Sequence, residues 1–300
     1  MRKNSIGTPL LSLIAGAVGF VLRYLYLTRA VEPDTGLPVL GSPAVLALVI
    51  YSVLIVILMV AVAYLAGRFF SSREGYLEVI APVTPVYRFT TGIAALLIFV
   101  SGVAGIVPAF AGEVLNSSAI AQSVLLMLAG ICLIGLAHEA SGQKNLRGAY
   151  PFSIVPEIAF TFWLLIYYRS SQKNPTMLTF VFILLALAAS VFAFYFNASY
   201  VFGRKAPQKF VFSHCVAIYF LVMSLADNIG FEKKLCFIGL ALYFTVNLSR
   251  FAANMIPKKK ARLATTASEP DIEMLTEDAS EDDIGEDEPT AMTEKMIENS

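Results

Sequence analysis

Charged residues are scarce in this 300-residue chain, and their scarcity excludes most classes of soluble protein. Lysine, arginine, aspartate and glutamate together make up 15% of the sequence, whereas hydrophobic residues make up 57%. Soluble globular chains average about a quarter charged residues. The composition therefore predicts an integral membrane protein, with the lipid bilayer as its first partner and no nucleic-acid partner.

Residue types that build catalytic and metal sites are also few. The sequence holds two histidines and three cysteines, and Cys132, Cys215 and Cys236 all fall within apolar runs. An odd number of such thiols gives no disulfide framework, and no spacing among them resembles a zinc site. His-x-x-Glu-His and Gly-x-Ser-x-Gly motifs are absent as well. We therefore expect no metal, no cofactor and no catalytic residues, and an intramembrane enzyme is the weakest of three functional hypotheses.

Long apolar runs are what the sequence has in abundance. A hydrocarbon core about 30 Å thick needs roughly 17–25 apolar residues in a helix, and lipid forces the backbone to satisfy its own hydrogen bonds. The fold class that these runs predict is all-α, a polytopic transmembrane helical bundle. Its eight expected spans are Pro9–Leu27, Pro43–Gly67, Phe89–Phe110, Ala119–Ala137, Tyr150–Tyr168, Leu178–Tyr200, Phe210–Ala226 and Leu235–Ala252. Between the second and third spans, Pro82 and Pro85 indicate an interfacial or re-entrant segment.

Basic residues in the short loops predict the orientation of the bundle. With the N-terminus inside, fifteen lysines and arginines fall on the inner side and five on the outer side. Cytoplasmic loops carry the excess of positive charge in membrane proteins. Both termini are therefore expected in the cytoplasm, and the protein is expected to be a multi-pass protein of the cytoplasmic membrane.

The last part of the chain differs in composition from the rest. Thirteen of the 22 acidic residues follow Leu263, where Lys295 is the one base, so the tail carries −12 and the preceding residues +12. A segment this polar cannot bury enough apolar surface to become ordered. We therefore divide the chain into a membrane domain (1–262) and a disordered acidic cytoplasmic tail (263–300). Anionic lipid is expected at Lys258, Lys259, Lys260 and Arg262, and a cytoplasmic protein partner is expected at the tail.

Ionisable groups at membrane depth are costly and therefore mark candidate functional sites. Glu157 lies near the middle of its span and follows Pro156, which predicts a helix kink where the carboxyl group sits. The alternative is that Glu157 only bonds a neighbouring helix. Further polar residues fall on the inner half of the spans under the predicted topology. These are His138, Glu139, Asn197, His214, Asn247 and Arg250.

The coincidence of depth among these residues predicts a polar cavity that opens to the cytoplasm. Glu157 is expected at its floor, with Arg250 or His214 as its partner. For Arg250, His138 and Glu139, the favoured alternative is placement near the lipid headgroups. Six aromatic residues at or near span ends are similarly interpreted as interfacial anchors, namely Tyr24, Tyr26, Trp163, Tyr167, Tyr168 and Tyr200.

Two functional hypotheses follow from these features. The polar set around Pro156 and Glu157 favours a transporter-like or solute-sensing bundle with a cytoplasm-facing cavity. Short loops and a charged tail fit the alternative, a membrane scaffold or accessory subunit that recruits a cytoplasmic partner through the tail. The sequence shows no pair of broken helices in matching halves, which many transporters have.

Overall fold

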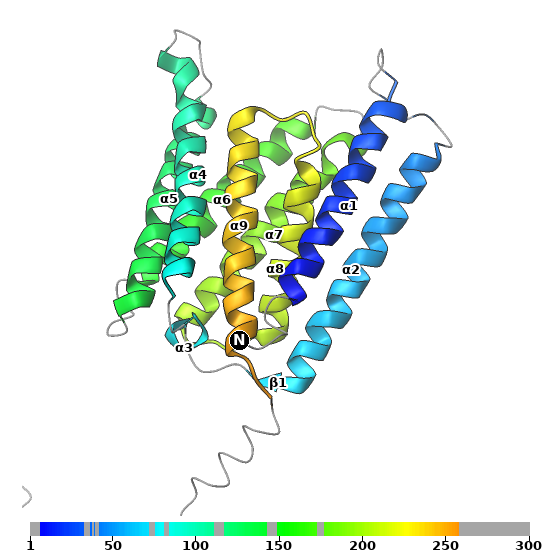
Figure 1. Ribbon diagram of the computed structural model, residues 1–300. Helices are drawn as coiled ribbons and strands as arrows, with labels where there is room; N and C mark the ends of the chain where they lie inside the picture. The colour runs from blue at the N-terminus through cyan, green and yellow to red at the C-terminus, as the bar shows by residue number, and fades with distance from the viewer. Residues whose placement is uncertain are drawn as a thin grey trace, which may run out of the picture. The chain divides into compact units, whose positions relative to one another are not determined.

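The structure is a computed structural model that describes residues 7–32, 37, 39, 42–71, 76–80, 84–110, 117–142, 149–172 and 177–257. Within these residues the helices are α1 (Gly7–Arg29), α2 (Pro43–Phe69), α3 (Tyr76–Ile80), α4 (Pro85–Phe110), α5 (Ser117–Gly142), α6 (Ala149–Ser171), α7 (Met177–Val201), α8 (Pro207–Ser224) and α9 (Phe231–Asn254) (Figure 1). Two short strands, β1 (Phe70–Ser71) and β2 (Ile256–Pro257), form an antiparallel pair. The predicted basic cluster at Lys258, Lys259, Lys260 and Arg262 and the acidic tail lie outside the described residues.

Seven of the described helices are long and apolar enough to cross a membrane, namely α1, α2, α4, α5, α6, α7 and α9. The protein is thus a multi-pass helical membrane protein, as the composition predicts. The seventh predicted span, Phe210–Ala226, corresponds to α8, which is not among these seven. Its 18 residues begin with Pro207, Gln208 and Lys209, whose polarity lowers the hydropathy of the whole helix.

Prolines mark several helix starts. Helices α2, α4 and α8 begin at Pro43, Pro85 and Pro207, where the missing N–H costs nothing because the first turn has no carbonyl to receive it. Pro156 instead lies inside α6, which continues through it. The connection between α7 and α8 turns at Gly203, whose φ of 77° is the left-handed conformation that glycine adopts most readily.

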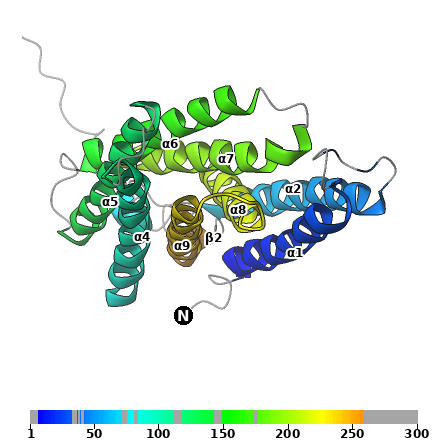
Figure 2. The ribbon, with the colours of Figure 1, turned by 90° about the horizontal axis from the view of Figure 1, so that it is seen from above.

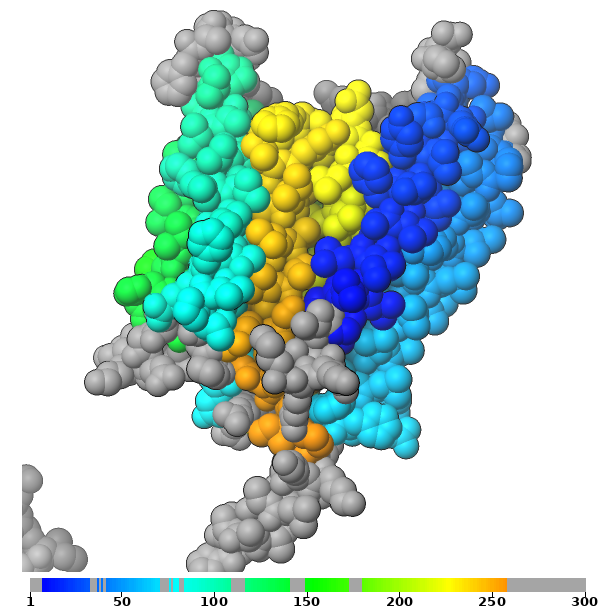
Figure 3. Space-filling model, in the orientation of Figure 1, coloured from blue at the N-terminus to red at the C-terminus, as the bar shows by residue number. Residues whose placement is uncertain are grey.

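Six helices pack into a closed ring. Each of α4, α5, α6, α7, α8 and α9 contacts the next in this order, and α9 contacts α4 again. Figure 2 shows this order from above, with α1 and α2 lying beyond α8. Helices α1 and α2 both pack on α8 from outside the ring, and α1 also touches α9. On one face of the bundle, α1, α9 and α4 lie side by side (Figure 3).

Aromatic side chains occupy the middle of the ring. The Phe194 ring of α7 lies 5.3 Å from Phe160 of α6 and 5.0 Å from Phe244 of α9, measured between centroids. Trp163 of α6 lies 5.6 Å from Phe237 of α9, so α6 and α9 meet across the ring. At this level, side chains rather than an open pore occupy the ring interior.

The β1–β2 pair joins the end of α2 to the end of α9, because Phe70 pairs with Pro257 and Ser71 with Ile256. We call this end of the bundle the ladder end. The short helix α3 lies at the same end and contacts α9, α7 and α5. The predicted interfacial segment therefore includes a helix that covers one end of the ring.

Candidate functional site

Six uncharged polar side chains, one of them from α3, gather inside the ring at the end that α3 covers. We call them the polar cluster. They are Tyr76 of α3, Tyr87 and Thr91 of α4, Asn197 of α7, and Tyr243 and Asn247 of α9. Each is at most 2% exposed. Four helices that are far apart in the sequence thus place hydroxyl and amide groups in one buried region of the protein.

Helical spacing explains how single helices contribute two groups each. Tyr87 and Thr91 are four residues apart on α4, as are Tyr243 and Asn247 on α9. Residues at this spacing lie on the same helix face, one turn apart. Because α4 packs on α9 in the ring, these two polar faces can meet.

Two hydrogen bonds of good geometry connect the described side chains of the cluster, and both cross between helices. The Tyr87 hydroxyl donates to Oδ1 of Asn247 over 3.0 Å, and Nδ2 of Asn197 donates to the Tyr243 hydroxyl over 2.8 Å. Hydrogen bonds of this length between buried neutral groups contribute about 1 kcal/mol each. They tie α4 to α9 and α7 to α9 near the ladder end.

Four polar atoms of the cluster make no hydrogen bond of good distance and angle among the described residues, although the hydroxyls of Tyr76 and Thr91 lie near that of Tyr87. They are the Tyr76 hydroxyl, Thr91 Oγ1, Asn197 Oδ1 and Asn247 Nδ2. A buried polar atom without a partner costs about 1–3 kcal/mol, and the large majority of buried side-chain polar atoms in folded proteins have a partner. Four together in one region indicate a place where a hydrogen-bonding molecule completes the set.

Helix α3 covers the cluster and is held by two side chains of α9. Arg250 donates from Nη2 to the carbonyl of Ile80 over 3.0 Å, and Nδ2 of Asn254 donates to the carbonyl of Val79 over 2.5 Å. Burial raises the pKa of Tyr76 well above its ordinary value, and the neighbouring hydroxyls of Tyr87 and Tyr243 raise it further. Tyr76 is therefore a neutral hydrogen-bond donor at physiological pH.

The structure brings together part of the predicted site. Asn197 and Asn247 both belong to the polar cluster, and Arg250 lies one turn beyond Asn247 on α9. Arg250 donates to the carbonyl of Ile80 on α3, and its placement near the headgroups stays a prediction. Four members of the cluster, the three tyrosines and Thr91, are not among the predicted site residues. One feature of the sequence could have indicated them: Tyr87 and Thr91 are four residues apart within an apolar run, so they share a helix face.

His214 takes part in packing next to the cluster. Its ring stacks on Phe210 at 3.9 Å between centroids and meets Phe244 edge-on at 5.3 Å. The Nδ1–H group donates to the carbonyl of Phe210 over 2.9 Å, since a carbonyl only accepts. Nε2 has no partner within the described part of the chain. His214 thus faces aromatic rings and not a carboxylate.

Glu157 lies apart from these residues. It is half-buried on α6, which packs between α5 and α7, and no hydrogen bond or ion pair of its carboxyl group is found among the described residues. The expected pairing with His214 or Arg250 is therefore not found among the described residues. Pro156 is buried at this level.

His138 and Glu139 lie near the end of α5. His138 is exposed and borders a shallow hollow of about 180 Å³ together with Arg88 and Gly92 of α4. Glu139 is half-buried. Neither residue is part of the polar cluster, and their position fits the interfacial interpretation.

Replacing Glu157 with leucine is expected to leave the free energy of unfolding in detergent within about 0.5 kcal/mol of the wild-type value or to raise it, because the carboxyl group has no partner to lose. Chemical denaturation of Glu157→Leu, with Glu157→Gln as the isosteric control, measures this. A loss above about 2 kcal/mol in the leucine variant, with the glutamine variant unchanged, would show that the side chain has a polar partner.

A second buried polar site lies near the opposite end of the bundle. Arg23 of α1 donates from Nε and Nη2 to Oδ1 of Asp227, over 2.8 and 2.6 Å. Asp227 follows α8, and both residues are buried. The guanidinium also lies 5.0 Å from the ring centroid of Tyr26 and 4.8 Å from that of Phe182. Burial raises the pKa of Asp227, and the charge of Arg23 opposes that rise.

The sequence places Arg23 and Asp227 at similar depth but does not show that they pair. Two opposite charges at the same depth in two apolar segments are the sequence feature that suggests a pair. The packing of α1 on α8 brings the two side chains into contact. The pair anchors α1 to the ring. We interpret it as structural, because it lies far along α1 from the ladder end.

Within the described ranges, no group of three or more His, Cys, Asp or Glu side chains is arranged to hold a metal ion. No family model, curated protein or solved structure matches the chain. The polar cluster therefore rests on its own geometry as the candidate functional site.

Proposed function

We propose that this protein is a transporter-like or solute-sensing membrane bundle that binds a small, uncharged, hydrogen-bonding solute at the polar cluster. The observation that carries the proposal is the set of four buried polar atoms, contributed by α3, α4, α7 and α9, that make no hydrogen bond of good distance and angle. The site differs in position from the expected cavity around Glu157, but it retains Asn197 and Asn247 from that expectation.

The chemistry of the four atoms favours a neutral solute. Asn197 Oδ1 accepts, Asn247 Nδ2 donates, and the hydroxyls of Tyr76 and Thr91 do both. None of the six side chains in the cluster carries a charge. An ion brought here would lose its hydration without an opposite charge to replace it, at a cost of several kcal/mol. A molecule with hydroxyl or amide groups would instead exchange hydrogen bonds with water for hydrogen bonds with the protein.

Access to the site is proposed to come from the ladder end, where α3 covers the cluster. The positive-inside count assigns this end to the cytoplasm. In support, α1 begins and α9 ends at the same end, since Gly7 and Ala252 border one groove. An even number of crossings gives that arrangement, so we propose that α8 is the eighth span. Its 18 residues lie among α1, α2, α7 and α9.

Solute binding is expected to raise the thermal stability of the purified protein. A ligand that binds only the folded state adds about 2.7 kcal/mol at one hundred times its Kd. Unfolding temperature in detergent would be measured against concentration for acetamide, urea, glycerol and glucose. At least one of them is expected to raise it in a saturable way, above its effect on an unrelated membrane protein.

Thr91→Val is the sharpest variant for this experiment. Valine has the shape of threonine without the hydroxyl, which makes no hydrogen bond of good distance and angle, so the solute-free protein is expected to be as stable as wild type or more stable. The stabilisation by solute is expected to fall by about fivefold or more in apparent affinity, the value of one hydrogen bond. Asn228→Ala, at an exposed position beyond α8, is the control and should leave the response unchanged. A wild-type protein that responds to none of the solutes would contradict the proposal.

The scaffold role is the second candidate function. The observation that favours it is the acidic tail, which concentrates a charge of −12 after Leu263. A disordered acidic segment binds basic protein surfaces by charge complementarity. Under this hypothesis no solute stabilises the membrane domain, so the experiment above separates the two functions.

A further inference from the structure

Helix α3 has one buried face and one exposed face. Tyr76, Val79 and Ile80 are each at most 3% exposed and share one side of the helix by their spacing. Glu78, on the other side, is exposed. Tyr76 belongs to the polar cluster, so the buried face of α3 borders the proposed solute site, and the exposed carboxyl group of Glu78 indicates that the other face meets water.

Contacts with the rest of the protein keep α3 in place, because isolated helices shorter than about 12–15 residues are marginal in water and α3 has five residues. The last carbonyls of a helix have no partner within it. In α3, the carbonyl of Val79 accepts from Asn254, and that of Ile80 accepts from both Nε and Nη2 of Arg250, over 3.3 and 3.0 Å. A cation at this end of a helix also interacts favourably with the helix dipole. Arg250 therefore stabilises the position of α3 in two ways.

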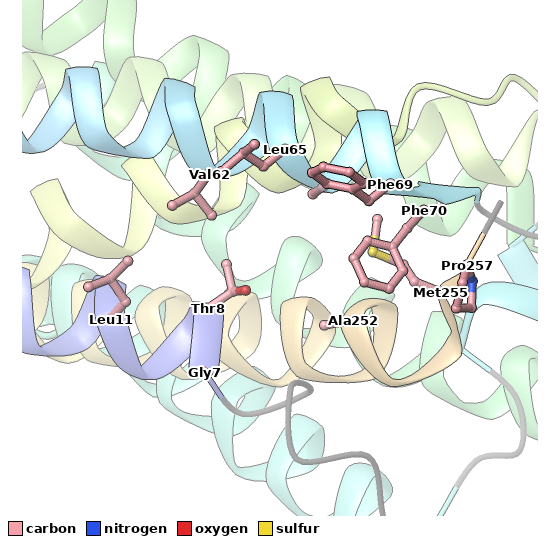
Figure 4. Close-up of a pocket in the computed structure, with 11 residues that line it drawn as sticks. Gly7, Thr8, Leu11, Val62, Leu65, Phe69, Phe70, Ala252, Met255 and Pro257 are labelled. Atoms are coloured by element: carbon pink, nitrogen blue, oxygen red, sulfur yellow. The ribbon is translucent and has the colours of Figure 1, made fainter. Parts of the chain in front are cut away.

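The two residues that hold α3 share a face of α9 with the solute site. Tyr243 and Asn247 of the polar cluster are followed, three and seven residues after Asn247, by Arg250 and Asn254, a spacing that keeps all four on one side of the helix. Ala252, on the opposite side, borders an apolar groove of about 720 Å³ between α1, α2 and α9 (Figure 4). One face of α9 thus carries both solute-site groups and the groups that hold α3.

The end of α9 is itself tied to α2 by the strand pair. Phe70 of β1 pairs with Pro257 of β2, and both residues border the groove at the ladder end (Figure 4). Backbone pairing therefore holds the end of α9, whereas side chains hold α3. Local opening is easiest where an element has few buried contacts, so α3 is the element expected to move and α9 the one expected to stay.

We propose that α3 is a lid over the polar cluster and that Arg250 is the positioning residue that holds this lid closed. The inference rests on the proposed function, because it gives the solute its route into the site from the ladder end. In the closed state, the Tyr76 hydroxyl lies within the cluster, where a bound solute can hydrogen-bond to it. When α3 moves away, the solute loses this bond and has a path to water. Solute binding thus favours the closed lid, and loss of Arg250 favours the open one.

Labelling of a cysteine on the buried face of α3 measures the opening of the lid. Val79→Cys places a thiol there with little change in volume. Val211→Cys, at a position of α8 that is also 3% exposed, is the matched reporter away from α3. Each purified variant in nanodiscs reacts with a charged methanethiosulfonate reagent, and the background from the three buried native cysteines is measured in the same proteins without the reporter. When closing is faster than labelling, the rate follows the open fraction.

Without solute, Arg250→Gln is expected to speed the labelling of Val79→Cys by about tenfold or more, the value of one hydrogen bond to a charged group, and to leave that of Val211→Cys unchanged. Arg250→Lys keeps a cationic donor and is expected to label more slowly than Arg250→Gln. Arg204→Gln, which removes an exposed charge between α7 and α8, is the control and is expected to change neither rate. No acceleration at Val79→Cys, or equal acceleration at both reporters, would overturn the lid.

A second set of rates separates failure of the lid from failure of the proposed function. Acetamide, urea, glycerol and glucose are added in turn, and a solute that stabilises the wild-type protein is expected to slow the labelling of Val79→Cys by about fivefold or more at saturation, but not that of Val211→Cys. If Arg250→Gln speeds labelling and none of the four solutes slows it, the lid is supported and the solute site is contradicted. If a solute stabilises the wild-type protein and Arg250→Gln leaves labelling unchanged, the site is supported and the lid is overturned.

Discussion

Replacing Arg23 with leucine is expected to lower the free energy of unfolding by about 3–5 kcal/mol, the largest loss for any single substitution considered. The change leaves the Asp227 carboxylate buried without its partner, and it also removes the guanidinium from the faces of Tyr26 and Phe182. Because Arg23 lies on α1 and Asp227 follows α8, the loss is expected to loosen α1 from the ring. Chemical denaturation of the purified variant, followed by circular dichroism, measures it.

The double variant Arg23→Leu, Asp227→Leu distinguishes a broken ion pair from lost packing. Without either charge, no buried carboxylate remains, so much of the stability lost in the single variant is expected to return. Arg29→Leu, at an exposed position at the end of the same helix, is the matched control and is expected to change stability by about 0.5 kcal/mol or less. If Arg23→Leu were as mild as Arg29→Leu, the ion pair would not anchor α1.

Adding one methyl group at Gly102 is expected to destabilise the protein by about 1–3 kcal/mol. A Cβ atom there would lie 2.6 Å from the carbonyl oxygen of Ser123 and 2.9 Å from the backbone nitrogen of Met127. Both atoms belong to the backbone of α5, so neither can move without shifting the helix. The contact between α4 and α5 is the most extensive in the ring, and close approach of this kind is how membrane helices associate.

Gly92→Ala provides the control on the same helix. A Cβ atom at Gly92 meets nothing within 4 Å, so alanine there is expected to stabilise α4 by about 0.5–1 kcal/mol through its better helix propensity. Thermal or chemical unfolding of Gly102→Ala and Gly92→Ala measures two shifts of opposite sign. Shifts of the same sign and size would contradict the close packing of α4 on α5.

The helices could be predicted from the sequence, whereas their arrangement in a ring could not. Every predicted span overlaps a helix of the structure, because hydrocarbon thickness fixes the length of an apolar run. Shape decides which helices become neighbours, as where Gly102 of α4 lies close to Met127 of α5, and apolar composition does not reveal these matches. The orientation of the termini remains a prediction from the loop charges.

The candidate site could be predicted in part. Asn197 and Asn247 are conspicuous because amides are rare at membrane depth. Tyrosine is ambiguous, since it serves both as an interfacial anchor and as a buried hydrogen-bonding group. Tyr26, Tyr200 and Trp163, expected at the interface, are at most 1% exposed and pack within the protein. The role of Glu157 stays a prediction, because depth in a span does not reveal which face of the helix meets a partner.

A high-resolution cryo-electron microscopy map of the protein in nanodiscs, with the stabilising solute present, tests the solute-binding site most directly. We expect density that belongs to no protein atom within hydrogen-bonding distance, about 2.7–3.2 Å, of Asn197 Oδ1 and Asn247 Nδ2. A map in which these two amides bond to Tyr76, Thr91 or each other, with no density between them, would contradict the account.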